Sequence, residues 1–439
     1  MPSTPNSPTA AEPRTPDGWR WAPWWVLAFV ALWPTPGIAE GVLVLGALAA
    51  IARLLAERFR GGSQLLSHEA WALTSVLFFA YWLPQLVSAL DAVDRSRAFL
   101  ESAKDLRYLP FLWLAAAAVA NPHGRRVTFV GLATIVAVWT ADALAQAVSG
   151  HSPMFSLLDQ AKQAISDRPL CPPDQIQDGA RLGGVLGPCN LKLGQVLASL
   201  SPFLLYVGGR RLGGPGWVLA AGAVGLVVLL TGTRAAWITF ALALLLSGWR
   251  VLGWRKLLGV FAFGALALAL LCTVSAPVRE RVGRTVAGFS AEQADVDRAL
   301  AGRSRIWSAA WCMAREHPFN GVGARGFRSA FAACDPQPGQ PPAWGEGPAL
   351  HAHQIVLEVL SETGAFGLLL WLAGVALAWR AWRYATPAAR DRARPAMLAL
   401  AVTVFPLNTH LAFYSTFWGG LTLMLAALFA GSLLARGRD

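Results

Sequence analysis

The sequence predicts an all-α polytopic integral membrane protein with about twelve transmembrane helices and a large, partly helical loop outside the membrane. Three observations support this class. The chain of 439 residues is 55% hydrophobic and only 14% charged. Its apolar runs repeatedly approach the roughly 20 residues that cross a bilayer core. These runs do not alternate in the way that barrel strands do, so helices are the remaining way to cross lipid. A soluble globular protein is therefore excluded.

Twelve apolar segments are candidate transmembrane helices, because each is bounded by polar or basic sequence. They are residues 21–33, 37–56, 69–90, 107–120, 126–149, 190–208, 215–231, 233–248, 256–276, 354–379, 395–411 and 414–435. The longest polar interruption falls between the ninth and tenth segments. We expect the chemistry of the protein to lie there, because the rest of the sequence is suited to lipid.

The chain divides into four parts on this basis. Residues 1–18 are rich in Pro, Ser and Thr and predict a disordered cytoplasmic tail. Residues 19–276 hold nine transmembrane helices and a loop at 150–189. Residues 277–353 form the large exterior loop, which we expect to be catalytic. Residues 354–439 hold the last three helices and a cytoplasmic C-terminus.

Basic residues explain the formal net charge of +12 without nucleic acid as a partner, because they fall in alternate loops. By the positive-inside rule these loops are cytoplasmic, both termini are inside, and the loops at 91–106, 150–189 and 277–350 are outside. The residues are Arg53, Arg58, Arg60, Arg125, Arg126, Arg210, Arg211, Arg250, Arg255, Lys256, Arg380, Arg383, Arg390, Arg392, Arg394, Arg436 and Arg438.

Four of the five cysteines fall in two of the predicted exterior loops. Cys171 and Cys189 share one loop, and Cys312 and Cys334 share the other. An oxidising compartment would allow a disulfide in each loop. Neither pair has zinc-type spacing, so no metal is predicted. The sequence also has no Walker loop or dinucleotide fingerprint, and we expect no nucleotide or other cofactor.

Three arginines lie on the predicted exterior side, next to apolar segments. Arg181 opens a Gly-rich turn, Arg234 lies in a tight turn between two spans, and Arg303 lies in the long loop, four residues before Trp307. A guanidinium binds phosphate oxygens bidentately and keeps its charge, so a convergent set would suit a diphosphate. The alternative is that each one reaches lipid headgroups or pairs with a carboxylate. Lys192 and Arg305 are weaker supporting candidates.

His353 is the candidate acid or base. It precedes a helix predicted to begin near Gln354, where the positive end of the helix dipole favours a neutral imidazole that can accept a proton. A capping or headgroup role is the alternative. His351 could support the site from the preceding turn. The glycines between Asn320 and Gly326 could expose backbone amides to an anion, although alone they are a weak signal.

Together these residues resemble the O-antigen ligase and polymerase superfamily of bacterial envelope glycosyltransferases. The resemblance covers roughly the C-terminal 260 residues and departs from the family pattern at Gln354, where members usually carry Asn. It rests on Gly302-Arg303 with Trp307, the run from His317 to Gly323, His353-Gln354 followed by Leu357, Glu362, Thr363 and Gly364, the turn from Thr231 to Arg234, and Arg181 with Gly184, Pro188 and Asn190.

The resemblance implies an O-antigen ligase of the bacterial inner membrane with its active site facing the periplasm. Such an enzyme transfers polysaccharide from undecaprenyl diphosphate to a sugar hydroxyl of lipid A-core, without metal and with inversion. His353 would be the general base. Arg181, Arg234 and Arg303 would hold the diphosphate, and Arg303 would also act in catalysis. An O-antigen polymerase or protein O-oligosaccharyltransferase remains an alternative, as does, from a different class, a secondary transporter.

Overall fold

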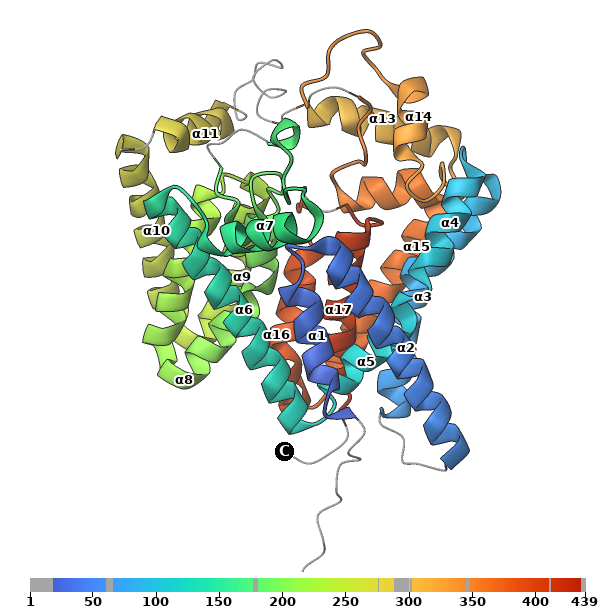
Figure 1. Cartoon of the computed structure of the whole chain (residues 1–439), viewed down its shortest axis with the longest axis horizontal. Helices are drawn as coiled ribbons and strands as arrows, with labels where there is room; N and C mark the ends of the chain where they lie inside the picture. Colours follow the sequence, from blue (N-terminus) through green and yellow to red (C-terminus); the bar gives the residue numbers. More distant parts are fainter. Residues whose placement is uncertain are drawn as a thin grey trace, which may run out of the picture.

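A computed structural model describes residues 19–60, 66–176, 181–274, 276–287, 300, 302–344, 347–409 and 412–435. The tail at 1–18, for which disorder is expected, lies outside these residues. The regular structure of the described residues is entirely helical, which confirms the predicted fold class. Figure 1 shows a bundle of long helices with α13 and α14 over one end.

The α-helices are α1 (Ala22–Ala31), α2 (Pro36–Arg60), α3 (His68–Ser88), α4 (Arg95–Asp105), α5 (Tyr108–Ala118), α6 (Pro122–Ser149), α7 (Pro153–Ser166), α8 (Leu193–Leu230), α9 (Arg234–Leu252), α10 (Trp254–Val274), α11 (Ala276–Ala287), α13 (Arg303–Glu316), α14 (Phe327–Cys334), α15 (Ile355–Tyr384), α16 (Pro387–Thr403) and α17 (Thr416–Leu433). Short 3₁₀ turns lie at Ala89–Asp91, Pro173–Gln175 and Gly184–Leu186.

The number of membrane spans is where the structure differs from the expectation. Each of the twelve predicted segments is largely helical, but only eight helices of the described chain are long and apolar enough to cross a membrane. α1 has 10 residues and α5 has 11. At about 1.5 Å per residue, each covers roughly half of a bilayer core of about 30 Å. The count of twelve spans is therefore not confirmed.

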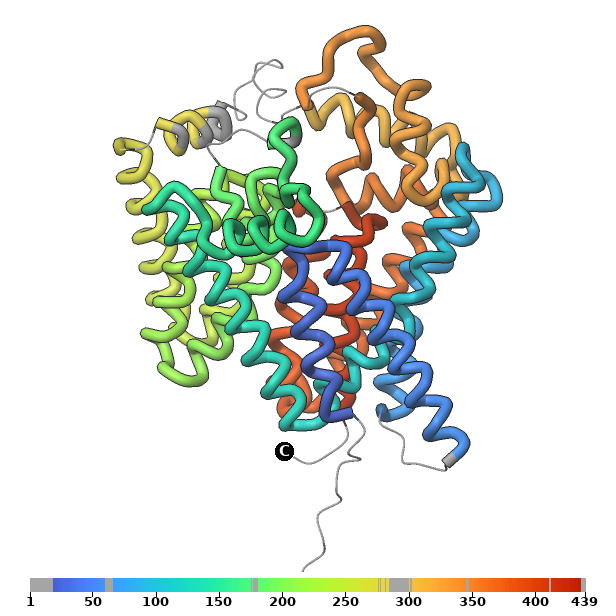
Figure 2. Tube along the Cα trace, in the orientation of Figure 1, coloured from blue at the N-terminus to red at the C-terminus, as the bar shows by residue number. Residues whose placement is uncertain are grey.

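Two predicted spans form one element in the structure. Residues 190–208 and 215–231 correspond to the two arms of α8, which is interrupted at Gly213 with φ 63° and ψ −147°. A positive φ of this kind is accessible to Gly at little steric cost. Figure 2 shows the chain reversing direction within α8, so the two arms lie side by side and antiparallel.

The core of the bundle is built around α17. In the most apolar stretch of α17, 89% of the residues are buried inside the protein. In that of α10, at the periphery, only 6% are buried. Small residues make close packing possible, since a Cβ at Gly431 would clash with the backbone of Ala116 in α5. A membrane helix in the middle of a bundle is packed by protein on all sides, while a peripheral one presents its apolar surface to lipid.

A bend in α15 positions the polar end of the molecule. Gly364 has φ 66° and ψ −167°, and a Cβ there would clash with the carbonyl of Phe319. The chain from Pro318 to Gly323 lies against this bend. The amides of Ala365 and Phe366 donate to the carbonyls of Pro318 and Phe319 at 2.8 and 3.0 Å. The bend thus frees two amides from hydrogen bonds within the helix, and the carbonyls of the loop accept them.

Candidate functional site

The predicted site residues lie at or just before the beginnings of helices. Arg234 is the first residue of α9 and Arg303 the first of α13, while His353 lies two residues before α15. Arg181 precedes the 3₁₀ turn Gly184–Leu186. Figure 1 shows α13 over the same end of the bundle at which α9 and α15 begin. The structure therefore brings together residues that are far apart in the sequence.

Two of the candidate arginines, Arg234 and Arg181, lie close enough to Arg303 to repel it. Burial, together with the charges of Arg234 and Arg181, lowers the pKa of Arg303 below its usual range. A helix N-terminus already carries partial positive charge, so an arginine at the first position adds like charge to it. Such an arrangement is unfavourable without an anion and becomes favourable when one binds.

His353 faces this cationic cluster. Burial and the charge of Arg303 lower its pKa to about 4, so the imidazole is neutral at pH 7. Its backbone adopts φ 54°, which is uncommon outside Gly. The ring centroid lies 3.9 Å from that of His351. Within the described part of the chain, the buried Nδ1 atom has no hydrogen-bond partner. A buried polar atom of this kind is a place where a substrate could make a hydrogen bond.

Two neighbouring side chains hold His353 in place. The Nε1–H of Trp307 donates to the carbonyl of Ala352 at 3.1 Å. The Oε1 of Gln354 caps α15 by accepting from the amide of Leu357 at 2.6 Å, and its Nε2 donates to the carbonyl of Pro406. Gln354 thus performs the capping role for which the shorter Asn is the commoner choice. The Trp307 spacing was visible in the sequence, whereas its contact with Ala352 was not.

The two weaker cationic candidates lie in other surroundings. Arg305 forms a bidentate ion pair with Asp335, with Nη2 to Oδ2 at 2.6 Å, and it also donates to the carbonyls of Gln337 and Gln340. It therefore holds the segment that follows α14. Lys192 ends 4.8 Å from the ring centroid of Phe417 at the start of α17. Neither contact is with a residue of the cluster around His353.

The Gly-rich run from Asn320 to Gly326 differs from the sequence expectation. Its amides are largely engaged in the fold. Those of Val322 and Gly323 donate to the carbonyls of Ser361 and Glu362 at 2.9 and 3.0 Å, and that of Arg325 donates to the Glu362 carboxylate at 2.6 Å. These donors are not available to an anion. The glycines instead allow close approach to α15, because a Cβ at Gly321 would clash with the backbone of Glu362.

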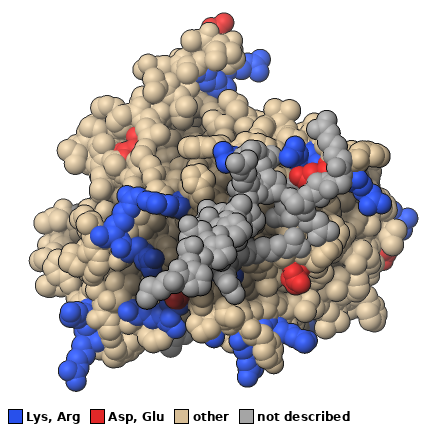
Figure 3. Space-filling model, turned by 90° about the horizontal axis from the view of Figure 1, so that it is seen from below, with Lys and Arg blue, Asp and Glu red and all other residues tan. Residues whose placement is uncertain are grey.

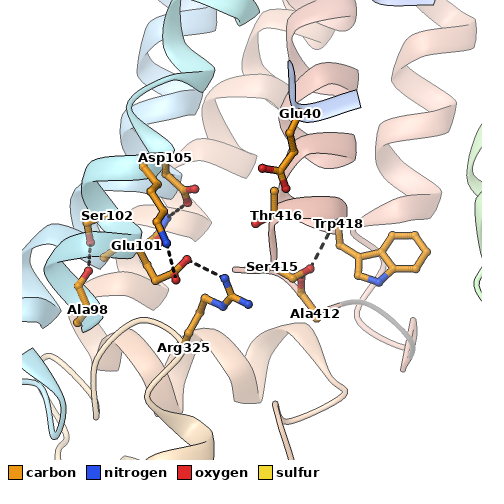
Figure 4. Close-up of polar contacts among 12 residues, drawn as sticks. Glu40, Ala98, Glu101, Ser102, Asp105, Arg325, Ala412, Ser415, Thr416 and Trp418 are labelled. Atoms are coloured by element: carbon orange, nitrogen blue, oxygen red, sulfur yellow. Dashed lines mark hydrogen bonds and ion pairs between the residues drawn. The ribbon is translucent and has the colours of Figure 1, made fainter. Parts of the chain in front are cut away.

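Arg325 and Glu101 join this loop to α4, a contact that the sequence did not indicate. Arg325 Nη1 lies 2.7 Å from Glu101 Oε2, and Figure 4 shows the two side chains pointing toward one another. Burial raises the pKa of Glu101, but the charges and hydrogen bonds of Arg325 and Lys104 together outweigh it, and the pKa falls below its usual range. The segment at 91–106 therefore supports the loop that carries Gly321 and Gly323.

Two disulfides lie in the segments at 150–189 and 277–353. Cys171 is bonded to Cys189 and Cys312 to Cys334, each with a Cα–Cα distance of 5.6 Å, and Cys272 is free. Among the described residues, one group has metal-type ligands close together, with the donor atoms of Cys312, Glu316 and Cys334 within 4.8 Å. Its two sulfurs are in the disulfide, whereas metal binding by cysteine requires thiolate.

The fold and the cluster define a class: a polytopic helical membrane protein with converging arginines and a neutral histidine at one end of its bundle. Residues 218–372 match the family model described as O-Antigen ligase. The match includes Arg234, Arg303, His351 and His353, while Arg181 and Lys192 precede it. A search of curated proteins finds no match.

Proposed function

We propose that the protein is an O-antigen ligase that transfers polysaccharide from undecaprenyl diphosphate to a sugar hydroxyl of lipid A-core. The observation that carries this proposal is the proximity of Arg181 and Arg234 to Arg303, which lies beside a neutral His353. The family match supports the class of reaction. In this proposal the cluster faces the periplasm, and both termini are on the cytoplasmic side of the bacterial inner membrane.

In the proposed reaction His353 accepts the proton of the acceptor hydroxyl as its oxygen attacks the anomeric carbon of the donor. The bond from that carbon to the diphosphate oxygen breaks, and the anomeric configuration is inverted. Undecaprenyl diphosphate leaves with both electrons of that bond. The three guanidinium groups stabilise the negative charge on the leaving group, and Arg303 does so next to the base. This chain's own side chains thus supply both the base and the charge stabilisation.

Donor binding would also strengthen the base. The pKa of His353 is about 4 in part because of Arg303. A diphosphate bound between the arginines would offset their charge, so the pKa of His353 would rise toward its usual range. Since a general base works best when its pKa lies near the working pH, the histidine would accept a proton most readily once the donor is bound.

The test incubates the purified full chain with a polyprenyl-diphosphate-linked glycan and lipid A-core, and follows the acceptor on a gel. We expect the acceptor to gain glycan. His353→Ala should reduce turnover by about 10²- to 10⁴-fold, as loss of a general base typically does. Arg303→Ala should also be severely impaired. Arg303→Lys should retain partial activity, because the ammonium keeps the charge but loses the bidentate fork.

Two matched controls separate site effects from general damage. His151 is exposed between α6 and α7, and Arg315 is exposed in the last turn of α13. His151→Ala and Arg315→Ala should both retain full turnover. Full activity of a folded His353→Ala protein would refute its role as the base. Lengthening of the lipid-linked glycan with an unchanged acceptor would instead identify an O-antigen polymerase.

A further inference from the structure

A cavity of about 640 Å³ is lined by residues near the start of α6, and Figure 1 shows α6 beginning at the end of the bundle opposite α13. It lies between the start of α6, the first arm of α8 and the start of α16. Its lining combines arginines with an apolar wall: Arg125, Arg126, Arg210, Arg211 and Arg392 with Phe129, Val130 and Val207, together with Pro122, Tyr206, Ala388 and Asp391. We call it the arginine cavity.

The arginine cavity has a strongly positive lining. Five guanidinium groups meet a single carboxylate, and that carboxylate, Asp391, already pairs with Arg394. Arg392 is held in position by donating to the main-chain carbonyls of Ser432 and Leu433 at the end of α17. Figure 3 shows the molecule from this end, where Lys and Arg outnumber Asp and Glu on the visible surface.

The helices add to this positive potential. Both α6 and α16 begin at the cavity, with Pro122 and Pro387 as their first residues, and neither carries an acidic residue in its first turn. Asn121 and Thr386 each cap one amide, but no carboxylate in the first turn offsets the partial positive charge of either N-terminus. Backbone ends and guanidinium groups both favour an anion, and a phosphate group matches the fork geometry of arginine.

The apolar wall identifies the source of that phosphate. Phe129, Val130 and Val207 line the same space as the arginines. A soluble phosphate ion would leave these side chains uncovered, whereas a glycerophospholipid has acyl chains next to its phosphate. We propose that the arginine cavity binds the headgroup of an anionic phospholipid, with the first part of its acyl chains against these three residues. The site is separate from His353 and does not depend on the proposed transfer reaction.

The test measures lipid binding to the full chain by native mass spectrometry, with phosphatidylglycerol and phosphatidylcholine as probes. We expect phosphatidylglycerol to give the tighter adduct. Removing two guanidinium groups with Arg210→Gln and Arg211→Gln together should weaken that adduct by roughly 10-fold or more, because charge-assisted hydrogen bonds are lost. Arg210→Lys with Arg211→Lys keeps the charge and should fall between the two.

The matched control removes the same charge nearby. Arg380 and Arg383 are exposed near the end of α15 and do not line the cavity, so Arg380→Gln with Arg383→Gln should leave binding within about twofold. If the variant with Arg210→Gln and Arg211→Gln does not fold, Arg126→Gln is combined with Arg210→Lys and Arg211→Lys instead. This variant should also bind phosphatidylglycerol more weakly than the wild type. Equal binding of the two lipids, or an equal loss in the control, would overturn the proposal. Displacement of the lipid by an equal concentration of inorganic phosphate would also overturn it, in favour of a soluble anion.

Discussion

Two of the candidate arginines lie at positions that helix energetics disfavour. Arg234 and Arg303 are the first residues of α9 and α13, where a cation costs about 0.3–1 kcal/mol relative to a neutral residue. The charges of Arg234 and Arg181 add further repulsion at Arg303. Because Arg234 and Arg303 lower the stability of the unbound protein, we attribute their positions to binding of an anion, such as the diphosphate of the proposed donor.

The lowered pKa of His353 predicts a pH-dependent stability that does not depend on any substrate. Its folded-state pKa is about 4, below the usual 6.5, so the unfolded chain binds more protons in the window between these values. Stability conferred by the neutral ring is therefore lost as pH falls from about 6.5 toward 4. We expect the Tm of the wild-type protein to drop more between pH 7 and pH 5 than that of His353→Gln.

Thermal unfolding in detergent at both pH values gives the comparison. The exposed His151→Gln variant serves as the control and should behave like the wild type. If the wild type and His353→Gln lose the same Tm over this interval, then the pKa of His353 is not lowered by burial and by Arg303 as described.

At the scale of elements, the bend of α15 and the loop from Pro318 to Gly323 depend on each other. Gly364 needs a positive φ and has the carbonyl of Phe319 where a Cβ would be. Gly364→Ala should therefore destabilise the protein by about 2 kcal/mol or more, because it strains the backbone and displaces the loop. A large fall in Tm is the expected readout.

Gly222 provides the matched control within a helix. It lies in the second arm of α8, and a Cβ there would meet nothing within 4 Å. Gly222→Ala should be neutral or slightly stabilising, since Ala is the better helix former. A Gly364→Ala protein that unfolds at the same temperature as Gly222→Ala would show that the bend does not require glycine.

At the scale of the whole molecule, the two disulfides predict the chemistry of all five cysteines. Cys171–Cys189 and Cys312–Cys334 leave Cys272 as the single thiol. Alkylation of the denatured protein should add one group without reductant and five with it, as read by intact mass. A Cys272→Ser control should add none without reductant. Three or more groups on the unreduced wild type would mean that at least one disulfide does not form.

Local features of the site were predictable from the sequence to a useful degree. His353 was expected just before a helix near Gln354, and the structure begins α15 at Ile355. The capping role of Gln354 itself was not foreseen, because it depends on the side-chain contact with Leu357. The sequence suggests Arg305 as a supporting residue of the site. In the structure it pairs with Asp335, a distant residue that only the fold brings close to it.

The sequence by itself determined the helical class and the approximate position of each apolar segment, because hydrophobicity and helix formation are properties of neighbouring residues. Tertiary structure alone decided the length and bending of the helices, including the short α1 and α5 and the reversal at Gly213. It also decided that Gly321 packs against α15 and that Arg181 and Arg234 lie near Arg303. These outcomes depend on contacts between distant segments, whose packing and electrostatic energies no local pattern encodes.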